Sequence, residues 1–276
     1  MPRGSRRRLI VNADDFGRSP SINQAVLRAH REGILTTASL MVNGDAFDEA
    51  VRLAREHPQL GVGLHLALIC GRSALPHDQI PGLVDPQQNF TNNPVAAGLR
   101  YFFDRSLRPQ LRREIDAQFQ KFFSTGLRLD HVNGHLHLHL HPTVFRILEH
   151  NVGDWQITHL RFTRDFFFLN LRLASGRLLY RVGHAVLFWF LSRRVRRALQ
   201  RERIRHTQAV FGLLQDSHVD EDYVTRLLPR LPPGDSELYS HPSLDQFKHE
   251  MDALLSPRVR ALVAQQHIQL IRYQDL

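Results

Sequence analysis

The chain has 276 residues, and its 36 lysines and arginines outnumber its 27 acidic residues, which gives a formal net charge of +9 at pH 7. This length suits one α/β barrel domain of about 250 residues. The single cysteine, Cys70, excludes an intrachain disulfide, and no segment reaches the roughly 18 uninterrupted apolar residues of a membrane-spanning helix. Residues 1–8 are basic and contain no apolar signal region, so we expect a cytoplasmic protein.

Short apolar runs alternate with longer amphipathic segments along the chain. Strands are predicted near residues 8–12, 36–42, 61–67, 129–137, 158–162, 237–240 and 268–272. Helices are predicted near residues 20–32, 46–56, 109–125, 143–151, 174–200, 220–230 and 245–265. This alternation predicts a mainly parallel sheet with helices outside it. We therefore expect residues 1–276 to form a single α/β domain that resembles a β/α barrel, either complete or distorted.

One segment, residues 72–106, contains several prolines and few periodic signals. Long stretches without secondary structure are uncommon in compact domains and are often functional. We expect this segment to be either a loop lid over the site or a surface excursion.

The first predicted strand runs directly into residues 12–17, which read NADDFG. Two adjacent carboxylates at the end of a buried strand are costly unless they bind a metal, join a hydrogen-bond network or share a proton. Neighbouring strand residues point to opposite faces, but a turn at Gly17 would bring both carboxylates to one site. We expect one aspartate to bind a metal and the other to accept a proton. The alternative is an N-cap or turn before the helix that begins near Ser19.

Two histidines lie in or just after predicted strands. His65 is in the apolar segment 61–68, and His241 follows residues 237–239 in the sequence SHP. On its own, His65 is more typical of a hydrogen-bonded core residue, and His241 is equally typical of a loop. Catalytic groups at the ends of several successive strands are, however, the pattern of a β/α barrel.

The strongest signal is in residues 130–142, which read DHVNGHLHLHLHP. Histidine or asparagine occupies every odd position from 131 to 141, with valine, glycine or leucine between them. This period of two predicts an extended segment with imidazoles on one face and apolar side chains on the other. Alternate strand residues lie about 6.5–7 Å apart, so at most one or two of these histidines can reach a single metal. The others would line a pocket, orient the ligands or bind substrate hydroxyls.

The positive charge is concentrated in residues 172–205, where ten arginines are interleaved with apolar and aromatic residues. A basic helix with an aromatic apolar face is typical of a helix that binds at a membrane surface. The alternative is an ordinary helix that packs its apolar side on the barrel and leaves its arginines in solvent. A nucleic-acid interface is disfavoured, because no nucleic-acid-binding motif accompanies the basic residues.

Together these motifs resemble the YdjC-like carbohydrate deacetylases over nearly the whole chain. The resemblance rests on motifs in matching order: NADDFG at 12–17, VNG at 42–44, GLH at 63–65, the histidine run at 131–139, SHP at 240–242 and YQDL at 273–276. It implies that Asp15, His65 and His135 bind a metal ion. It also implies that Asp14 is the catalytic base and that His241 is the catalytic acid.

The activity that this resemblance implies is metal-assisted hydrolysis of the amide of an N-acetylated amino sugar. Zinc suits two imidazoles and a carboxylate, with magnesium or manganese as alternatives. Arg161, at a predicted strand end, is a further candidate that would orient Asp14 or the substrate. The chain departs from the family pattern at Asn133, where the family commonly has aspartate. This departure changes the surroundings of the site and removes no implied ligand.

A narrower resemblance links residues 166–170, 187–192 and 210–214 to the hopanoid-biosynthesis-associated member of the family. It implies an N-acetylglucosaminyl hopanoid, a glycolipid, as the substrate, and a peripheral position on the inner face of the membrane. Soluble chitooligosaccharides are the alternative substrate. Two other classes stay open, namely a metal-dependent phosphoesterase and a non-catalytic lipid carrier or membrane scaffold that uses residues 172–205.

Overall fold

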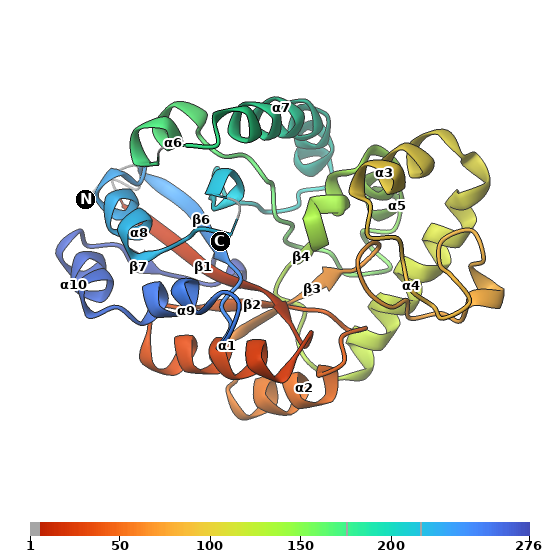
Figure 1. Ribbon diagram of the computed structural model, residues 1–276, viewed down its shortest axis with the longest axis horizontal. Helices are drawn as coiled ribbons and strands as arrows, with labels where there is room; N and C mark the ends of the chain where they lie inside the picture. The colour runs from red at the N-terminus through yellow and green to blue at the C-terminus, as the bar shows by residue number, and fades with distance from the viewer. Residues whose placement is uncertain (1–5, 175, 216) are drawn as a thin grey trace.

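A parallel sheet curls through the centre of the computed structural model, and helices surround it (Figure 1). The structure describes residues 6–174, 176–215 and 217–276. Within these ranges the strands are β1 (Arg7–Phe16), β2 (Thr37–Leu40), β3 (Gly61–Leu66), β4 (Val132–Gly134), β5 (Ala209–Phe211), β6 (Gly234–Ser240) and β7 (Gln269–Leu270). They pair in the order β4-β3-β2-β1-β6-β5, with β7 beside β1, and all of these pairings are parallel, as predicted.

Helices follow the strands in sequence and cover the outside of the sheet. They are α1 (Pro20–Glu32), α2 (Phe47–Glu56), α3 (Pro94–Phe103), α4 (Arg108–Ser124), α5 (Pro142–His150), α6 (Phe167–Leu173), α7 (Leu178–Arg201), α8 (Glu221–Leu227), α9 (Lys248–Leu255) and α10 (Pro257–Gln265). α1 matches its predicted bounds, because Ser19 caps its first turn and Pro20 suits the first helical position. The apolar residues of β1, such as Leu9 and Val11, are fully buried in the core between sheet and helices.

The edge strands β4 and β5 are joined through an irregular segment, residues 158–164. The strand predicted near residues 158–162 is present here only as isolated parallel β-bridges at His159 and Leu160. The backbone N–H of Arg161 donates to the carbonyl of Val132 in β4 at 3.0 Å. On the other side, the N–H of Val210 in β5 donates to the carbonyl of Arg164 at 2.9 Å. Because the segment contacts each neighbour at few positions, the barrel is curled and incomplete, which is the distorted form of the predicted fold.

Other elements also differ from those that the sequence pattern predicts. The segment 72–106 contains a helix, α3, whose first turn is capped by the side chain of Asn93. The helix predicted near 245–265 is divided, because Pro257 cannot continue α9 and Ser256 caps α10. β5 and α6 have no predicted counterpart, since three and seven residues carry too little periodicity to be recognised.

The histidine run is not an extended strand, which corrects the strand predicted near 129–137. β4 ends at Gly134, and the 3-10 segment η4 (His135–Leu140) follows it. Leu136 and His137 have φ angles of 49° and 57°, in the left-handed region. The period of two in the sequence therefore does not place the imidazoles on one strand face, although several of them still reach one site.

The arginine-rich segment forms α7, which lies on the outside of the molecule beside α6 (Figure 1). α7 begins at Leu178, four residues later than predicted, because Gly176 and Arg177 have positive φ angles of 76° and 48°, which a right-handed helix does not contain. In the described parts of the chain, no helix combines the length and the apolar character needed to cross a bilayer.

Candidate metal and catalytic centre

Five of the predicted site residues line one cavity of about 710 Å³. Asp14 and Asp15 lie at the carboxyl end of β1, His65 near the end of β3, His135 just after β4 and His241 just after β6. Parallel strands place their carboxyl ends at the same edge of the sheet, and for this reason residues far apart in the sequence meet here.

The two neighbouring aspartates face the same cavity because β1 is irregular at Asp15. Asp15 has a φ of 64°, and the pairing of β1 with β2 changes register between Ala13 and Phe16. This β-bulge takes the Asp15 side chain out of the strict alternation of the strand. The sequence predicts the convergence from a turn at Gly17, which also has a positive φ of 91°, but the structure begins it two residues earlier.

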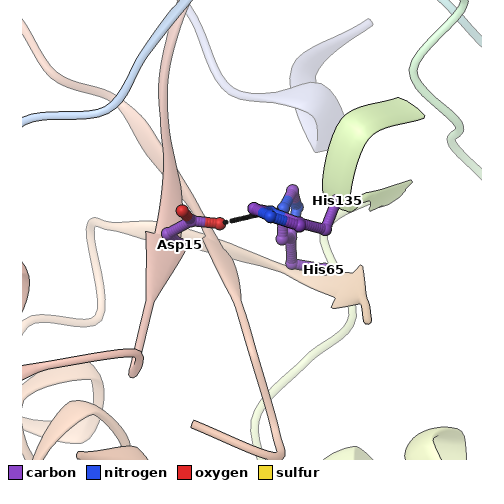
Figure 2. Close-up of side chains that lie close together, drawn as sticks. All are labelled: Asp15, His65 and His135. Carbon is purple, nitrogen blue, oxygen red and sulfur yellow. Dashed lines mark hydrogen bonds and ion pairs between the residues drawn. The ribbon is translucent and has the colours of Figure 1, made fainter. Parts of the chain in front are cut away.

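Asp15, His65 and His135 turn their ligand atoms toward one another, and these atoms all lie within 4.8 Å (Figure 2). Asp15 Oδ1 lies 3.2 Å from His65 Nε2 and 3.0 Å from His135 Nδ1. Atoms that bind zinc at about 2.0–2.1 Å in tetrahedral geometry lie roughly 3.3 Å apart, close to these separations. His65 Nε2 is buried and has no hydrogen-bond partner. The three residues therefore fit a divalent cation.

Asp15 and His135 perturb each other strongly. Burial alone would raise the pKa of Asp15, but the imidazoles of His135 and His65 hold it well below its ordinary value. Burial alone would lower the pKa of His135, but the Asp15 carboxylate raises it to about 10. The Asp15 carboxylate thus favours a proton on His135, and a cation held by these two residues would take the place of that proton.

Asn133 connects the group of possible ligands, Asp15, His65 and His135, to Asp14. Its Oδ1 accepts a hydrogen bond from Nδ1 of His65 at 2.7 Å, which leaves Nε2 of that imidazole facing Asp15. Its Nδ2 donates to Oδ1 of Asp14 at 3.0 Å and to Oγ of Ser39 at 2.8 Å. An asparagine can make both kinds of bond because it carries a donor and an acceptor, whereas an ionised aspartate can only accept.

A bidentate ion pair holds Asp14 against Arg161. The two carboxylate oxygens lie 2.6 and 3.0 Å from the guanidinium nitrogens. Burial alone would raise the pKa of Asp14, but Arg161, with help from His65, holds it far below its ordinary value and keeps the carboxylate ionised.

Arg161 is itself fully buried and lies behind Asp14, outside the lining of the cavity. The guanidinium also donates to Oε1 of Glu237 at 2.7 and 2.9 Å, and the hydroxyl of Tyr273 donates to the other oxygen of Glu237. The Tyr239 ring covers the guanidinium at 4.5 Å. Arg161 is thus fixed by its neighbours and acts on the site through Asp14.

His241 faces the cavity from the loop after β6 and is paired with Glu250 of α9. Its Nδ1 lies 3.7 Å from Oε2 of Glu250, which also accepts a hydrogen bond from the His241 backbone N–H. Burial lowers the pKa of His241, but Glu250, together with Asp15 and Asp14, raises it above its ordinary value. A raised pKa favours the protonated form of the imidazole, which can donate a proton.

The other histidines of the run do not belong to the group formed by Asp15, His65 and His135. His137 lines the cavity, and its Nε2 lies 3.0 Å from the hydroxyl of Tyr239. His139 is fully buried, with its Nε2 3.0 Å from the carbonyl oxygen of Arg161. His131 is hydrogen-bonded to buried side chains at both ring nitrogens. These histidines therefore shape and support the site.

Several residues to which the sequence analysis assigns no role complete the network around Asp14 and His241: Asn12, Ser39, Glu237, Tyr239 and Glu250. β6 carries a usable signal, because Glu237 and Tyr239 occupy alternate positions of one strand face and His241 continues that series. Asn12 belongs to the first motif. Glu250, in the first turn of α9, carries no local signal that points to His241.

The cavity has a polar end and an apolar wall. The polar end is formed by five residues: Asp14, Asp15, His65, His135 and His241. Val95 and Leu99 of α3 and Leu187 and Phe188 of α7 supply much of the wall. The segment 72–106, which contains α3, thus contributes to the cavity directly.

Comparison with known proteins places this chain in a family. Residues 8–265 match the family described as YdjC-like protein. A carbohydrate deacetylase from Brevibacillus brevis is 43% identical over 141 residues, which cover 51% of this chain and 54% of the relative. A carbohydrate deacetylase from Mus musculus is 31% identical over 309 aligned positions, which cover 98% of this chain and 95% of the relative.

A solved structure shares the fold. It is a candidate cellobiose-phosphate cleavage protein from Enterococcus faecalis V583, 23% identical, with a TM-score of 0.74 and coverage of 98% of this chain and 99% of that one. In the matches at 43% identity, the chain spans about half the length of the curated relatives.

Proposed function

The chain belongs to the YdjC-like protein family, and we propose that it is a metal-dependent hydrolase that removes the acetyl group from an N-acetylated amino sugar. The observation that carries this proposal is that Asp15, His65 and His135 share one cavity with Asp14 and His241. The cavity would thus combine three ligands for a cation, an ionised carboxylate and an imidazole whose pKa is raised. Amide hydrolysis can use each of these groups.

Asp15, His65 and His135 would hold the cation, which leaves coordination positions open for substrate and water. Zinc suits this donor set, and magnesium or manganese are the alternatives. When bound, such a cation lowers the pKa of a water molecule and polarises the acetyl carbonyl. Asn133 keeps the correct nitrogen of His65 turned toward the cluster.

Asp14 would accept a proton from the attacking water as the water oxygen bonds to the carbonyl carbon. A base must be ionised before it can act, and the ion pair with Arg161 keeps Asp14 ionised across the working pH range. Glu237 and Tyr239 hold the guanidinium in place, so Asp14 keeps one orientation. Arg161 is a positioning residue in this scheme.

His241 would donate a proton to the amide nitrogen as the carbon–nitrogen bond breaks. Without that proton the amine is a poor leaving group, and its protonation lets the products separate as acetate and the free amino sugar. Glu250 favours the protonated form of His241. The acid and the base are thus two groups whose environments shift their pKa values in opposite directions.

For the substrate we propose an amino sugar carried on a hydrophobic group, in particular an N-acetylglucosaminyl hopanoid or a similar glycolipid. Residues of α3 and α7, among them Leu99 and Phe188, line the cavity beside its polar end. Burial of hydrocarbon against such a wall favours binding, and a free sugar has little apolar surface to bury there. The protein would act in the cytoplasm, at the inner face of the membrane. Soluble chitooligosaccharides are the competing substrate.

The test measures acetate released by the metal-loaded protein from an N-acetylglucosaminyl lipid and from N,N′-diacetylchitobiose. We expect acetate from both, with the larger kcat/KM for the lipid. Asp14→Asn and His241→Gln should lose most turnover, whereas His150→Gln, which changes an exposed histidine of α5, is the matched control. A preference for diacetylchitobiose would replace the glycolipid by a soluble sugar. Hydrolysis of a phosphodiester without any acetate release would contradict the deacetylase function.

A further inference from the structure

The exposed side of α7 carries large apolar side chains. Leu179, Val186 and Phe190 are 90%, 51% and 63% exposed, while Arg181 and Ser192 of the same helix are each 3% exposed. A surface helix normally buries its apolar stripe and exposes its polar residues. The interpretation of residues 172–205 as an ordinary helix with its apolar side packed on the barrel therefore does not describe the first half of α7.

α3 exposes a similar apolar face. Val95, Leu99 and Phe103 are 69%, 55% and 73% exposed, and their spacing of four residues places them on one side of the helix. Val95 and Leu99 also line the active-site cavity, as does the half-exposed Leu187 of α7. Exposed apolar residues of both helices thus line the same cavity.

We define the α3–α7 surface by six of these exposed residues: Val95, Leu99, Phe103, Leu179, Val186 and Phe190. On α7 the exposed face continues beyond Phe190 with Arg193, Arg194 and Arg197, which follow at helical spacings of three, four and seven. Neither α3 nor α7 contains an acidic residue. The apolar surface is therefore continuous with a region of positive charge.

We propose that the α3–α7 surface docks on a lipid bilayer that contains anionic headgroups. The apolar side chains would enter the interfacial region while the arginines contact lipid phosphates. Trp189 is half exposed beside them, with the Arg193 guanidinium over its ring at 5.4 Å, an arrangement suited to the boundary between hydrocarbon and headgroups.

A second copy of the chain is a poorer occupant of this surface. It would bring the same arginines to the contact, and neither helix offers a carboxylate to neutralise them. An anionic bilayer supplies both the apolar phase and the negative charge. Charge complementarity therefore selects the bilayer.

Docking in this orientation turns the opening of the cavity toward the membrane. For a glycolipid substrate, which rests on the function proposed above, the hydrocarbon would pass from the bilayer along Leu99 and Leu187 into the cavity without entering water. The docking itself depends on the exposed residues and charges and not on the identity of the substrate.

The test is co-sedimentation of the purified full chain with two kinds of vesicle, phosphatidylcholine alone and phosphatidylcholine mixed equally with phosphatidylglycerol. We expect binding to the anionic vesicles that weakens at high salt. Each arginine near an anionic surface contributes about five-fold in affinity, so replacing Arg193, Arg194, Arg196 and Arg197 with Gln should reduce binding by about 100-fold or more. The charge-matched control replaces four exposed arginines of α1, α4, α8 and α10 with Gln: Arg31, Arg112, Arg226 and Arg260.

The apolar half of the surface is tested separately on the two helices. Phe103→Ser on α3, and Leu179→Ser combined with Phe190→Ser on α7, should each reduce binding to anionic vesicles, because the replaced side chains are exposed and the fold does not depend on them. Leu244→Ser, at an apolar position that is 44% exposed and lies outside both helices, is the control and should bind like the unmodified chain.

Equal binding to neutral and anionic vesicles, or no binding to either, would overturn the proposal. So would a dimer in solution that is abolished by Phe103→Ser, since a second copy would then be the occupant. All of these variants should release acetate from soluble diacetylchitobiose at the rate of the unmodified chain. Vesicle binding without acetate release would reject the proposed function alone, and acetate release without vesicle binding would reject the docking surface alone.

Discussion

The side-chain amide of Asn133 donates a hydrogen bond to Oδ1 of Asp14 at 3.0 Å. The same side chain accepts a hydrogen bond from Nδ1 of His65 at 2.7 Å. One residue thus sets the orientation of a proposed metal ligand and of the proposed base. The two halves of the site are coupled through a single amide.

Variants of Asn133 separate these two contacts. Asn133→Leu removes both, and we expect it to weaken zinc binding by about 10- to 100-fold, because the loss of such a supporting contact frees the ligand imidazole. Asn133→Asp keeps the acceptor for His65 and should bind zinc nearly as well as the unmodified chain. It should still lose turnover, since it cannot donate to Asp14. Calorimetric zinc titration of metal-free protein measures the difference, and equal affinities in the two variants would contradict the orienting role.

The metal ligands are tested by removing single imidazoles. His65→Ala and His135→Ala should each strongly reduce the metal that co-purifies with the protein, because a cation with three protein ligands loses one of them. His139→Ala should reduce it much less, since the Nε2 of His139 contacts the carbonyl of Arg161 outside the cluster. Elemental analysis of the purified variants decides, and unchanged stoichiometry in His135→Ala would reject the assignment.

The two aspartates should behave differently on replacement. Asp14→Asn should retain the metal but lose turnover by about 10²–10⁴-fold, the typical effect of removing a general base. Asp15→Asn should lose the metal first, because Asp15 lies within reach of both imidazoles. Metal content and single-turnover rates measured on the same samples distinguish the two roles. Loss of metal in Asp14→Asn with retention in Asp15→Asn would reverse them.

The pH dependence of turnover should reflect His241. Its pKa is raised by Glu250, with Asp14 and Asp15 as further negative neighbours, so the acid form persists above the ordinary histidine range. As pH rises through that raised pKa the proton is lost, and kcat should fall on the alkaline side. Glu250→Gln removes the neighbouring charge, and the alkaline limb should then move to lower pH.

The control for this shift is Glu32→Gln, which changes an exposed carboxylate of α1. Its profile of kcat against pH should match that of the unmodified chain. If the alkaline limb of Glu250→Gln stays in place, His241 is not the group that loses its proton there.

The residues that meet at the site could largely be predicted from the sequence, because they lie at the ends of strands of a parallel sheet. Asp15, His65 and His135 meet for that reason, and the details of the loops matter little. The alternation in β6 was a further usable signal, since Glu237 and Tyr239 share a face with each other. Motifs at strand ends are informative because the topology alone brings them together.

The backbone at the site could not be predicted in the same way. Asp15 and His137 have positive φ angles, which non-glycine residues rarely adopt and which only the surrounding structure can impose. The period of two in the histidine run therefore indicated a strand where the chain turns. Glu250 could not be identified either, because its contact with His241 joins separate elements and leaves no mark in the local pattern.

The irregular closure of the barrel had a similar cause. Residues 158–164 look like a strand by composition, but they bond to β4 and β5 at only a few positions. The apolar faces of α3 and α7 also have the spacing of buried helix faces, and only the structure shows that they are exposed. Sequence patterns give the period of an element, whereas tertiary packing decides which side meets solvent.

We propose that this cavity hydrolyses an N-acetyl group with the help of a bound cation. One measurement tests this directly: metal is removed from the protein with a chelator, zinc is added back in steps, and acetate released from N-acetylglucosaminyl lipid is measured at each step. We expect negligible release without metal, a rise in proportion to bound zinc until the site formed by Asp15, His65 and His135 is filled, and little release at any zinc concentration in Asp14→Asn. Full acetate release by the metal-free protein would show that the cation is not needed.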